Sequence, residues 1–218
     1  ASVIGRSAAI NSVRQIIDRV APTHSRVLII GPAGSGKEVV ARTIHQKSSR
    51  ADGPFIVLNA ATMAPERMEE ELFGVEYEAD QDTHKLKMGT LEQAHGGTLL
   101  IDQVVDMPLE TQAKILQVLQ DQSFSRLGSG RTIKVDVRVI AASSRDLLTE
   151  IARKDFREDL YYRLNVVPIE LPALRDRAED LPELIDYFMT QTAYSSGLPA
   201  RKIAKDAIAL MQACDWPG

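Results

Sequence analysis

Short runs of branched apolar residues alternate along the chain with stretches whose apolar positions recur every three or four residues. The runs lie at 27–30, 55–58, 98–101, 137–141 and 166–171. Runs of this length and composition are typical of strands buried on both faces of a parallel sheet. The helical spacing covers 7–20, 37–48, 65–73 and 108–121. Strands that alternate with helices predict an α/β domain with a mostly parallel sheet.

Three segments depart from this alternation. Residues 75–88 are polar and show no clear period, so we expect a loop or an insertion there. Gly128-Ser129-Gly130 separates two short apolar segments, which predicts a small hairpin. After Leu171 the helical patterns dominate. The sequence therefore predicts an α/β unit over residues 1–172 and a small all-helical unit over residues 173–218.

Composition narrows the classes of function. The 218 residues are 44% hydrophobic and 26% charged, which is ordinary for a globular protein. A net charge of -4 disfavours a strongly basic nucleic-acid-binding surface in this stretch. The one cysteine, Cys214, excludes a disulfide framework and indicates a reducing compartment. No apolar run approaches the roughly 20 residues that a membrane span needs, so we expect a cytoplasmic protein without membrane contact.

A glycine-rich segment directly after the first apolar run carries the strongest chemical signal. It fits the pattern G-x-x-x-x-G-K between a predicted strand and a predicted helix. In such a loop the backbone N–H groups and the helix N-terminus surround phosphate oxygens, and the lysine reaches the outer phosphates. We expect ATP or ADP to contact Gly31, Pro32, Ala33, Gly34, Ser35, Gly36, Lys37 and Glu38, and we add Ile4 and Gly5 to this set.

A nucleotide bound in such a loop needs an acidic side chain for its Mg²⁺ ion. Asp102, at the end of the run 98–101, is the natural candidate, because Mg²⁺ prefers oxygen ligands and keeps several waters. Glu38 stands where the pattern usually has a Ser or Thr that contacts the metal. Its carboxylate can meet the ion directly or through water, so we expect both residues to be metal ligands.

The residue after Asp102 bears on hydrolysis. P-loop ATPases commonly have a glutamate there to activate the attacking water, and this chain has Gln103. An amide can hold a water molecule but cannot accept its proton at neutral pH. Since a general base contributes roughly 10²–10⁴ in rate, the sequence predicts ATP binding with slow hydrolysis.

Taken together, these motifs resemble the AAA+ domain of bacterial enhancer-binding proteins, the sigma-54 activator-type response regulators. The resemblance implies a P-loop NTPase fold with a parallel sheet flanked by helices, and a small helical lid that is incomplete at its C-terminus. The matching stretches cover almost the whole chain and are 31–38, 55–59, 71–74, 96–102, 156–164 and 216–218.

The resemblance also implies roles for individual residues. Gln103 stands in place of the family's catalytic glutamate, and Asn59 matches the asparagine that holds that glutamate. Ser144 lies at the position that senses the γ-phosphate. Arg157 and Arg163 match the arginine fingers, which reach the ATP of a neighbouring subunit. From spacing alone, the two arginines would instead form ion pairs along their own helix with Glu158 or Asp159.

The family's sigma-54 contact motif, G-A-F-T-G-A, is absent. The aligned residues, 78–83, read Glu-Ala-Asp-Gln-Asp-Thr and offer no apolar anchor for a partner, so we expect no contact with sigma-54. This departure is similar to that of nitrogen-regulation response regulators, which also have a receiver domain and a DNA-binding domain. The resemblance thus implies a sensor histidine kinase and DNA as partners through domains outside these residues.

Two interpretations of function remain open. In one, the chain binds ATP with weak or no hydrolysis and self-associates, for example as a dimer, to regulate transcription. In the other, it is an active ATPase that assembles into a ring, for example a hexamer, and remodels a transcription complex. A small-molecule P-loop kinase is a third class, but it explains neither the helical unit nor the stretch 156–164.

Overall fold

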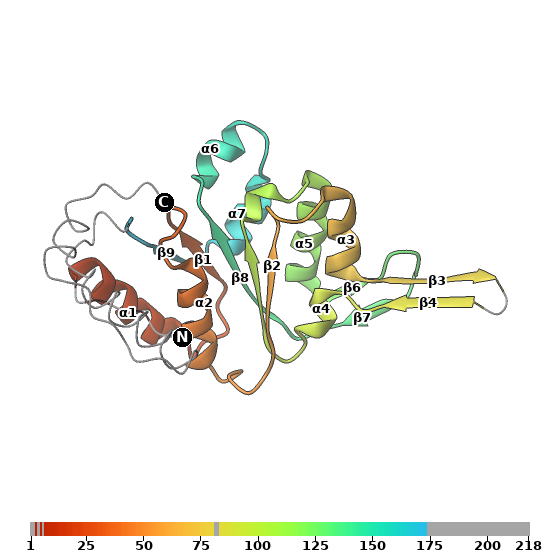
Figure 1. Cartoon of the computed structure of the whole chain (residues 1–218), viewed down its shortest axis with the longest axis horizontal. Helices are drawn as coiled ribbons and strands as arrows, with labels where there is room; N and C mark the ends of the chain where they lie inside the picture. Colours follow the sequence, from red (N-terminus) through yellow and green to blue (C-terminus); the bar gives the residue numbers. More distant parts are fainter. Residues whose placement is uncertain (1–2, 4, 6, 81–82, 174–218) are drawn as a thin grey trace, which may run out of the picture.

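The computed structural model describes residues 3, 5, 7–80 and 83–173 (Figure 1). Five parallel strands form its central sheet in the order β2-β5-β8-β1-β9. Each strand coincides with one of the five apolar runs, which confirms the predicted parallel sheet. Their bounds are β1 Val27–Ile30, β2 Phe55–Asn59, β5 Thr98–Asp102, β8 Arg138–Ser143 and β9 Val167–Glu170.

Helices cover both faces of this sheet (Figure 1). One core lies against α1 (Ala8–Val20) and α2 (Lys37–Gln46) and contains the buried residues Ile17, Ile29 and Ile44. The other core contains Leu72, Leu99 and Ile115. The remaining helices are α3 Pro65–Phe73, α4 Thr90–Gln93, the 3₁₀ helix Val104–Asp106, α5 Leu109–Asp121, α6 Leu147–Ala152 and α7 Glu158–Leu164.

Helix α1 shows how the local sequence sets these elements. The Ser7 side chain accepts a hydrogen bond from the Ile10 N–H at 3.3 Å and so caps the first turn. The buried positions of the helix then recur at helical spacing, which fixes the face that packs on the sheet: Ile10, Val13, Ile17 and Val20.

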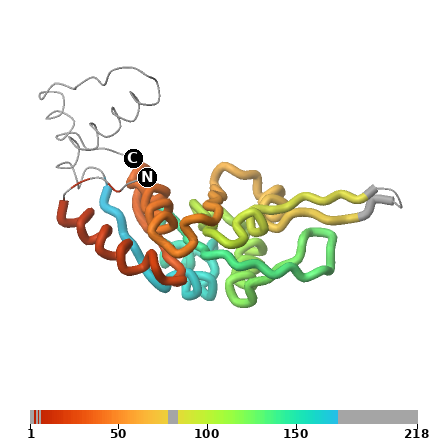
Figure 2. The backbone as a smooth tube through the Cα atoms, turned by 90° about the horizontal axis from the view of Figure 1, so that it is seen from below, coloured from red at the N-terminus to blue at the C-terminus, as the bar shows by residue number. Residues whose placement is uncertain are grey.

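Residues 75–88, predicted as a loop or an insertion, are not an irregular loop. This segment forms an antiparallel hairpin of β3 (Val75–Asp80) and β4 (Thr83–Lys87), which projects from the body of the domain (Figures 1 and 2). The predicted second hairpin, β6 (Ser123–Ser125) and β7 (Thr132–Lys134), is present beside it, joined by a bridge between Val75 and Leu127.

Contacts from outside the segment explain why its own pattern gave no signal. Arg126 donates to Glu76 on β3 at 2.7 Å and forms a two-point ion pair with Glu92, also at 2.7 Å. The apolar side chains Tyr77 and Leu86 are exposed rather than buried in a core. The hairpin therefore depends on cross-strand pairing and on this ion-pair network instead of a buried face of its own.

Several predictions concern residues that the structure does not describe. The helical unit predicted over 173–218, with Cys214, lies outside the described residues except for Ala173, and so does Ile4. Among the helices of the described ranges, none is long and apolar enough to cross a bilayer.

Candidate nucleotide-binding site

The strand order brings three distant segments together at one edge of the sheet. Strand β8 pairs with both β1 and β5, so the carboxyl ends of these three parallel strands are neighbours. The glycine-rich loop follows β1, Gln103 follows β5, and Ser144 follows β8. This is the edge at which open α/β sheets bind ligands.

The glycine-rich loop turns tightly into α2. The Ser35 N–H donates to the Pro32 carbonyl at 3.1 Å, and Gly36 caps the helix with a φ of 96°. That left-handed conformation is open to glycine at little cost, whereas a side chain would strain it. The first N–H groups of α2 have no acceptor within the helix, and together with the helix dipole they form an anion-binding position.

Lys37 lies inside this loop with only 7% of its surface exposed. Its Nζ donates to the carbonyl oxygens of Gly31 at 2.9 Å and Pro32 at 3.0 Å, and to the Ser144 hydroxyl at 3.1 Å. Burial lowers the pKa of Lys37, and the nearby Asp102 carboxylate partly offsets this effect. All three acceptors are neutral, so phosphate oxygens would be stronger partners for the same ammonium group.

Gln103 is held in an unusual backbone conformation, with a φ of 52°. Its Nε2 donates to the Ser144 Oγ at 2.7 Å, and its Oε1 accepts from the Ser144 N–H at 3.4 Å. Its own N–H donates to the Asp102 Oδ1 at 2.9 Å. A residue other than glycine keeps a left-handed backbone conformation only where its surroundings enforce it. The amide serves as donor and acceptor at once, which a carboxylate cannot do.

Two other predicted site residues have different neighbours. Asn59 lies beside Asp102 in the sheet register, but its Oδ1 accepts from the Ala61 N–H at 2.9 Å, so the side chain bonds to its own loop. Glu38 is half exposed and pairs with Arg42 one turn along α2, at 3.4 Å. Of the two predicted metal ligands, only Asp102 thus lies next to the buried lysine.

Ser35 supplies an observation that favours a phosphate ligand. Its Oγ is buried and has no hydrogen-bond partner. A buried polar atom without a partner is costly, and a bound phosphate would provide one. A side chain at Gly31 would approach this Oγ to 2.6 Å, so the loop has room for the hydroxyl only because residue 31 is glycine. The donors present therefore fit a polyphosphate, and Asp102 fits its Mg²⁺ ion.

The two predicted arginine fingers differ in their partners. Arg157 binds Asp159 through two hydrogen bonds, of 3.0 and 2.8 Å, so the ion-pair interpretation holds for it in the single chain. This contact raises the pKa of Arg157 and lowers that of Asp159. Arg163 is exposed in the last turn of α7, and no carboxylate pairs with it within residues 7–80 and 83–173.

The fold and the chemistry of this edge define a P-loop NTPase of the AAA+ class. Comparison with known families agrees in more detail. Residues 3–170 match the Sigma-54 interaction domain, and residues 175–218 match an AAA+ ATPase lid domain. The chain therefore belongs to the Sigma-54 interaction domain family.

Individual relatives are similar over the whole chain. The nitrogen assimilation regulatory protein NtrX of Azorhizobium caulinodans is 52% identical over 217 residues, which are 100% of this chain and 47% of that protein. The DNA-binding transcriptional regulator NtrC of Rhizobium meliloti is 43% identical over 99% of this chain and 44% of its own length. The chain thus spans about half the length of the curated relatives it matches.

Solved structures show the same relationship. NtrX from Brucella abortus, crystallised in complex with ADP and also with ATP, is 53% identical with a TM-score of 0.89. These matches cover 100% of this chain and 48% or 49% of those chains. The P-loop NTPase domain of a sigma-54 transport activator from E. coli is 24% identical over 78% of this chain and 99% of its own, and its TM-score of 0.54 supports the fold alone.

The direct contact between Gln103 and Ser144 is the feature of this site that the sequence did not reveal. Both residues were recognised as candidates, but they are 41 positions apart and follow different strands. In the sequence, each of the two residues directly follows an apolar run. Because β5 and β8 are neighbouring strands, the two residues meet in the fold.

Proposed function

We propose that this chain is the ATP-binding regulatory domain of a two-component transcriptional regulator and that it hydrolyses ATP slowly or not at all. The observation that carries the proposal is the chain of contacts from Lys37 through Ser144 to Gln103. A buried lysine in a P-loop supports nucleotide binding, while an amide at the base position supports slow chemistry. The ATP and ADP complexes of NtrX from Brucella abortus give further support.

Nucleotide binding follows from the donors of the loop. The free N–H groups at the start of α2, the Ser35 hydroxyl and the Lys37 ammonium would receive phosphate oxygens. Asp102 would hold Mg²⁺ together with the phosphates and water. The ion, when bound, neutralises phosphate charge. Glu38 would reach it only after leaving Arg42.

Slow hydrolysis follows from the chemistry of residue 103. The Gln103 amide can orient a water molecule, but it cannot take a proton from it. Each functional atom of the amide makes one hydrogen bond to Ser144, which leaves one N–H and one lone pair to hold a water molecule.

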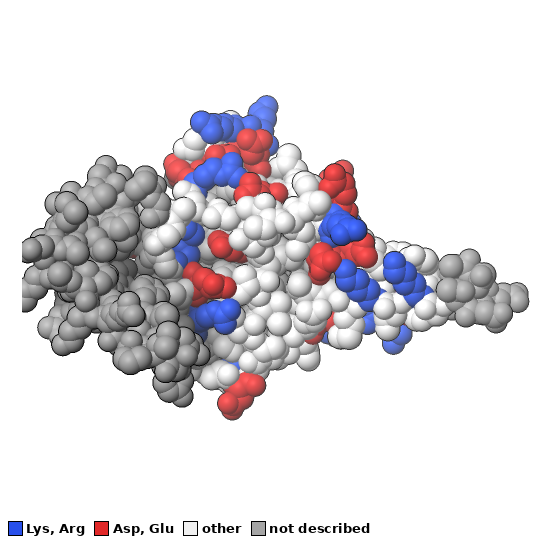
Figure 3. Space-filling model, in the orientation of Figure 1, with Lys and Arg blue, Asp and Glu red and all other residues white. Residues whose placement is uncertain are grey.

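The proposal also covers partners. The sequence of the β3–β4 hairpin is acidic at 78–83 and has no apolar anchor there. The regulator would therefore act without contacting sigma-54. Figure 3 shows basic side chains on the described part of this hairpin, beside acidic side chains of the body. A sensor kinase and DNA would be bound by other domains of a longer cytoplasmic regulator, and the name of the Rhizobium meliloti relative, a DNA-binding transcriptional regulator, supports the DNA partner.

One observation favours a second candidate, an active ring-forming ATPase. Arg163 is exposed and has no carboxylate partner in the described part of the chain. An exposed arginine without a carboxylate partner could bind the nucleotide of a second copy of the chain. There it would stabilise the negative charge of the transition state.

A single set of measurements separates the two candidates. ATP and ADP binding is measured by calorimetry, phosphate release at saturating ATP, and mass by light scattering with and without ATP. The proposal expects one nucleotide per chain and turnover far below the typical enzyme value of about 10 s⁻¹. The ring-forming ATPase would be established instead by two results together. Turnover per chain would rise with protein concentration, and it would fall in Arg163→Ala but not in the exposed control Arg153→Ala.

A further inference from the structure

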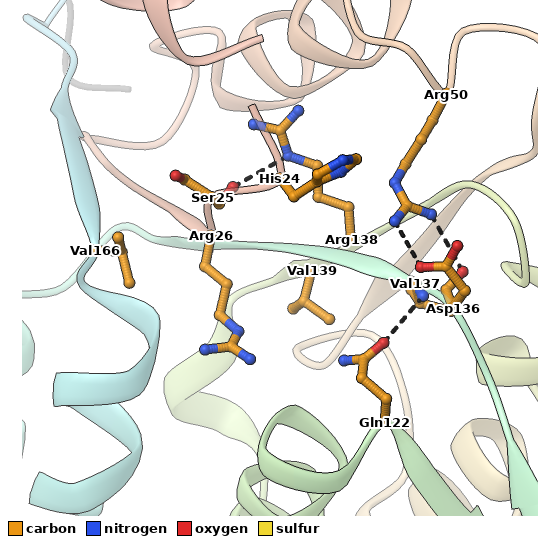
Figure 4. A pocket seen from close by; sticks show the side chains of 10 residues that line it. All are labelled: His24, Ser25, Arg26, Arg50, Gln122, Asp136, Val137, Arg138, Val139 and Val166. Atoms are coloured by element: carbon orange, nitrogen blue, oxygen red, sulfur yellow. Dashed lines mark hydrogen bonds and ion pairs between the residues drawn. The ribbon is translucent and has the colours of Figure 1, made fainter. Parts of the chain in front are cut away.

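A second cavity lies at the edge of the sheet opposite the nucleotide site. Its volume is about 610 Å³, and it is open at the amino ends of β1, β8 and β9. Arg26 directly precedes β1, and Arg138 is the first residue of β8 (Figure 4). Because β1 has four residues at about 3.3 Å each, the P-loop and this cavity are separated by about 13 Å of strand.

The lining of the cavity is strongly basic. The lining includes three arginines, Arg26, Arg50 and Arg138, and one carboxylate, Asp136. Asp136 is already bound by Arg50 at 2.6 Å. The lining residues therefore carry an excess of two positive charges.

Arg26 is the least compensated of these charges. Its NH2 group donates to the Leu119 carbonyl at 2.5 Å, and within the described residues no carboxylate pairs with it. Burial lowers the pKa of Arg26, and the neighbouring charge of Arg163 on α7 lowers it further. The charge of Arg163 is unfavourable for Arg26, and an anion beside Arg26 would relieve this repulsion.

Arg138 and Gln122 complete the polar lining. Arg138 is buried and donates to the carbonyls of Val20, Ala21 and Ser25 at 2.8 to 3.1 Å, and no carboxylate in the described part of the chain pairs with it. The Gln122 Oε1 accepts from the Val137 N–H at 3.3 Å. Figure 4 shows the remaining amide nitrogen and the Arg26 guanidinium directed into the same space, below Val139.

We propose that this cavity binds a small organic dianion, a dicarboxylate or a phosphate monoester, with Arg26 as its principal ligand. Guanidinium groups bind carboxylate and phosphate through paired hydrogen bonds. Three valines in the lining provide contact for a carbon skeleton, which an inorganic ion lacks. The volume is in the range of small-molecule sites. The proposed anion site does not depend on nucleotide binding. Its test is therefore separate from the test of the proposed function.

Calorimetry on the 218-residue chain tests the site with three probes at constant ionic strength: glutarate, glycerol 3-phosphate and inorganic phosphate. We expect one of the two organic probes to bind with one equivalent per chain and more tightly than inorganic phosphate; which one binds identifies the anionic group. Arg26→Gln should weaken this binding by about tenfold or more, since a charged hydrogen-bond partner is lost. The exposed control Arg153→Gln should change it less than about twofold.

Two further variants keep the test decisive. If Arg26→Gln fails to fold by circular dichroism, Arg26→Lys carries the test, because it keeps the charge and loses the paired geometry; it should weaken binding by about threefold or more. Lys37→Ala should leave probe binding intact, and its loss there would place the anion in the P-loop and overturn the proposal. Unchanged binding in the Arg26 variants, no saturation by either organic probe, or equal binding of inorganic phosphate (an adventitious ion only) would also overturn it.

Discussion

Replacing Gln103 by glutamate should convert a slow site into a faster one. The substitution exchanges the Nε2 group, which donates to Ser144 Oγ at 2.7 Å, for a carboxylate oxygen that can accept a proton from water. A general base contributes about 10²–10⁴ in rate, which corresponds to a barrier lower by about 2.7–5.4 kcal/mol. Against this, the lost hydrogen bond to Ser144 costs about 1 kcal/mol. The expected net gain in kcat is therefore about tenfold to a thousandfold.

The assay is phosphate release at saturating ATP, with ATP affinity measured in parallel. Gln103→Met is the control, because it removes the Nε2 hydrogen bond to Ser144, and the Oε1 bond as well, without adding a base. We expect Gln103→Glu to be faster than the parent chain, Gln103→Met to be no faster, and ATP affinity to stay within about threefold in both. A Gln103→Glu chain no faster than the parent, or a parent already turning over at about 10 s⁻¹, would refute the reasoning.

Three further predictions concern stability. His45 has a lowered pKa, chiefly through burial, so the unfolded chain binds its proton near pH 6.5 while the folded chain does not. The free energy of unfolding should thus fall as pH drops below about 6.5, and His45→Gln should remove this part of the urea-melt pH dependence; an unchanged slope would contradict it. Arg138→Leu should cost about 3 kcal/mol or more by urea denaturation, as three carbonyls lose a charged donor. Arg126→Ala should accelerate amide exchange in β3–β4 far more than in the central sheet, and uniform acceleration would argue against its role as the hairpin's anchor.

The central sheet and the P-loop could be predicted because their signals are local. A parallel strand buried on both faces needs a continuous apolar run, and all five runs became strands. The P-loop likewise needs glycines and a lysine at fixed spacing between a strand and a helix, and Lys37 lies where that spacing predicts. In both cases the physical requirement is met by neighbours in the sequence.

The features that were missed depend on residues far apart in the chain. The hairpin at 75–88 is anchored by Arg126, which lies outside it, so its own polar pattern indicated a loop. The contact of Gln103 with Ser144 exists because β8 lies between β1 and β5, an order that no single segment encodes. The effect of the Arg163 charge on the pKa of Arg26 arises in the same way, because the two residues are far apart in the sequence and interact only in the folded chain.

The most direct test of the central claim is ATP affinity in Lys37→Ala, measured by calorimetry against the parent chain. Lys37 is the full positive charge within the loop, and its three hydrogen bonds end on neutral acceptors that a triphosphate would replace. The account predicts one ATP per parent chain and a loss of affinity of about a hundredfold or more in the variant, with Arg153→Ala unchanged. Equal ATP affinity in Lys37→Ala and the parent chain would contradict it.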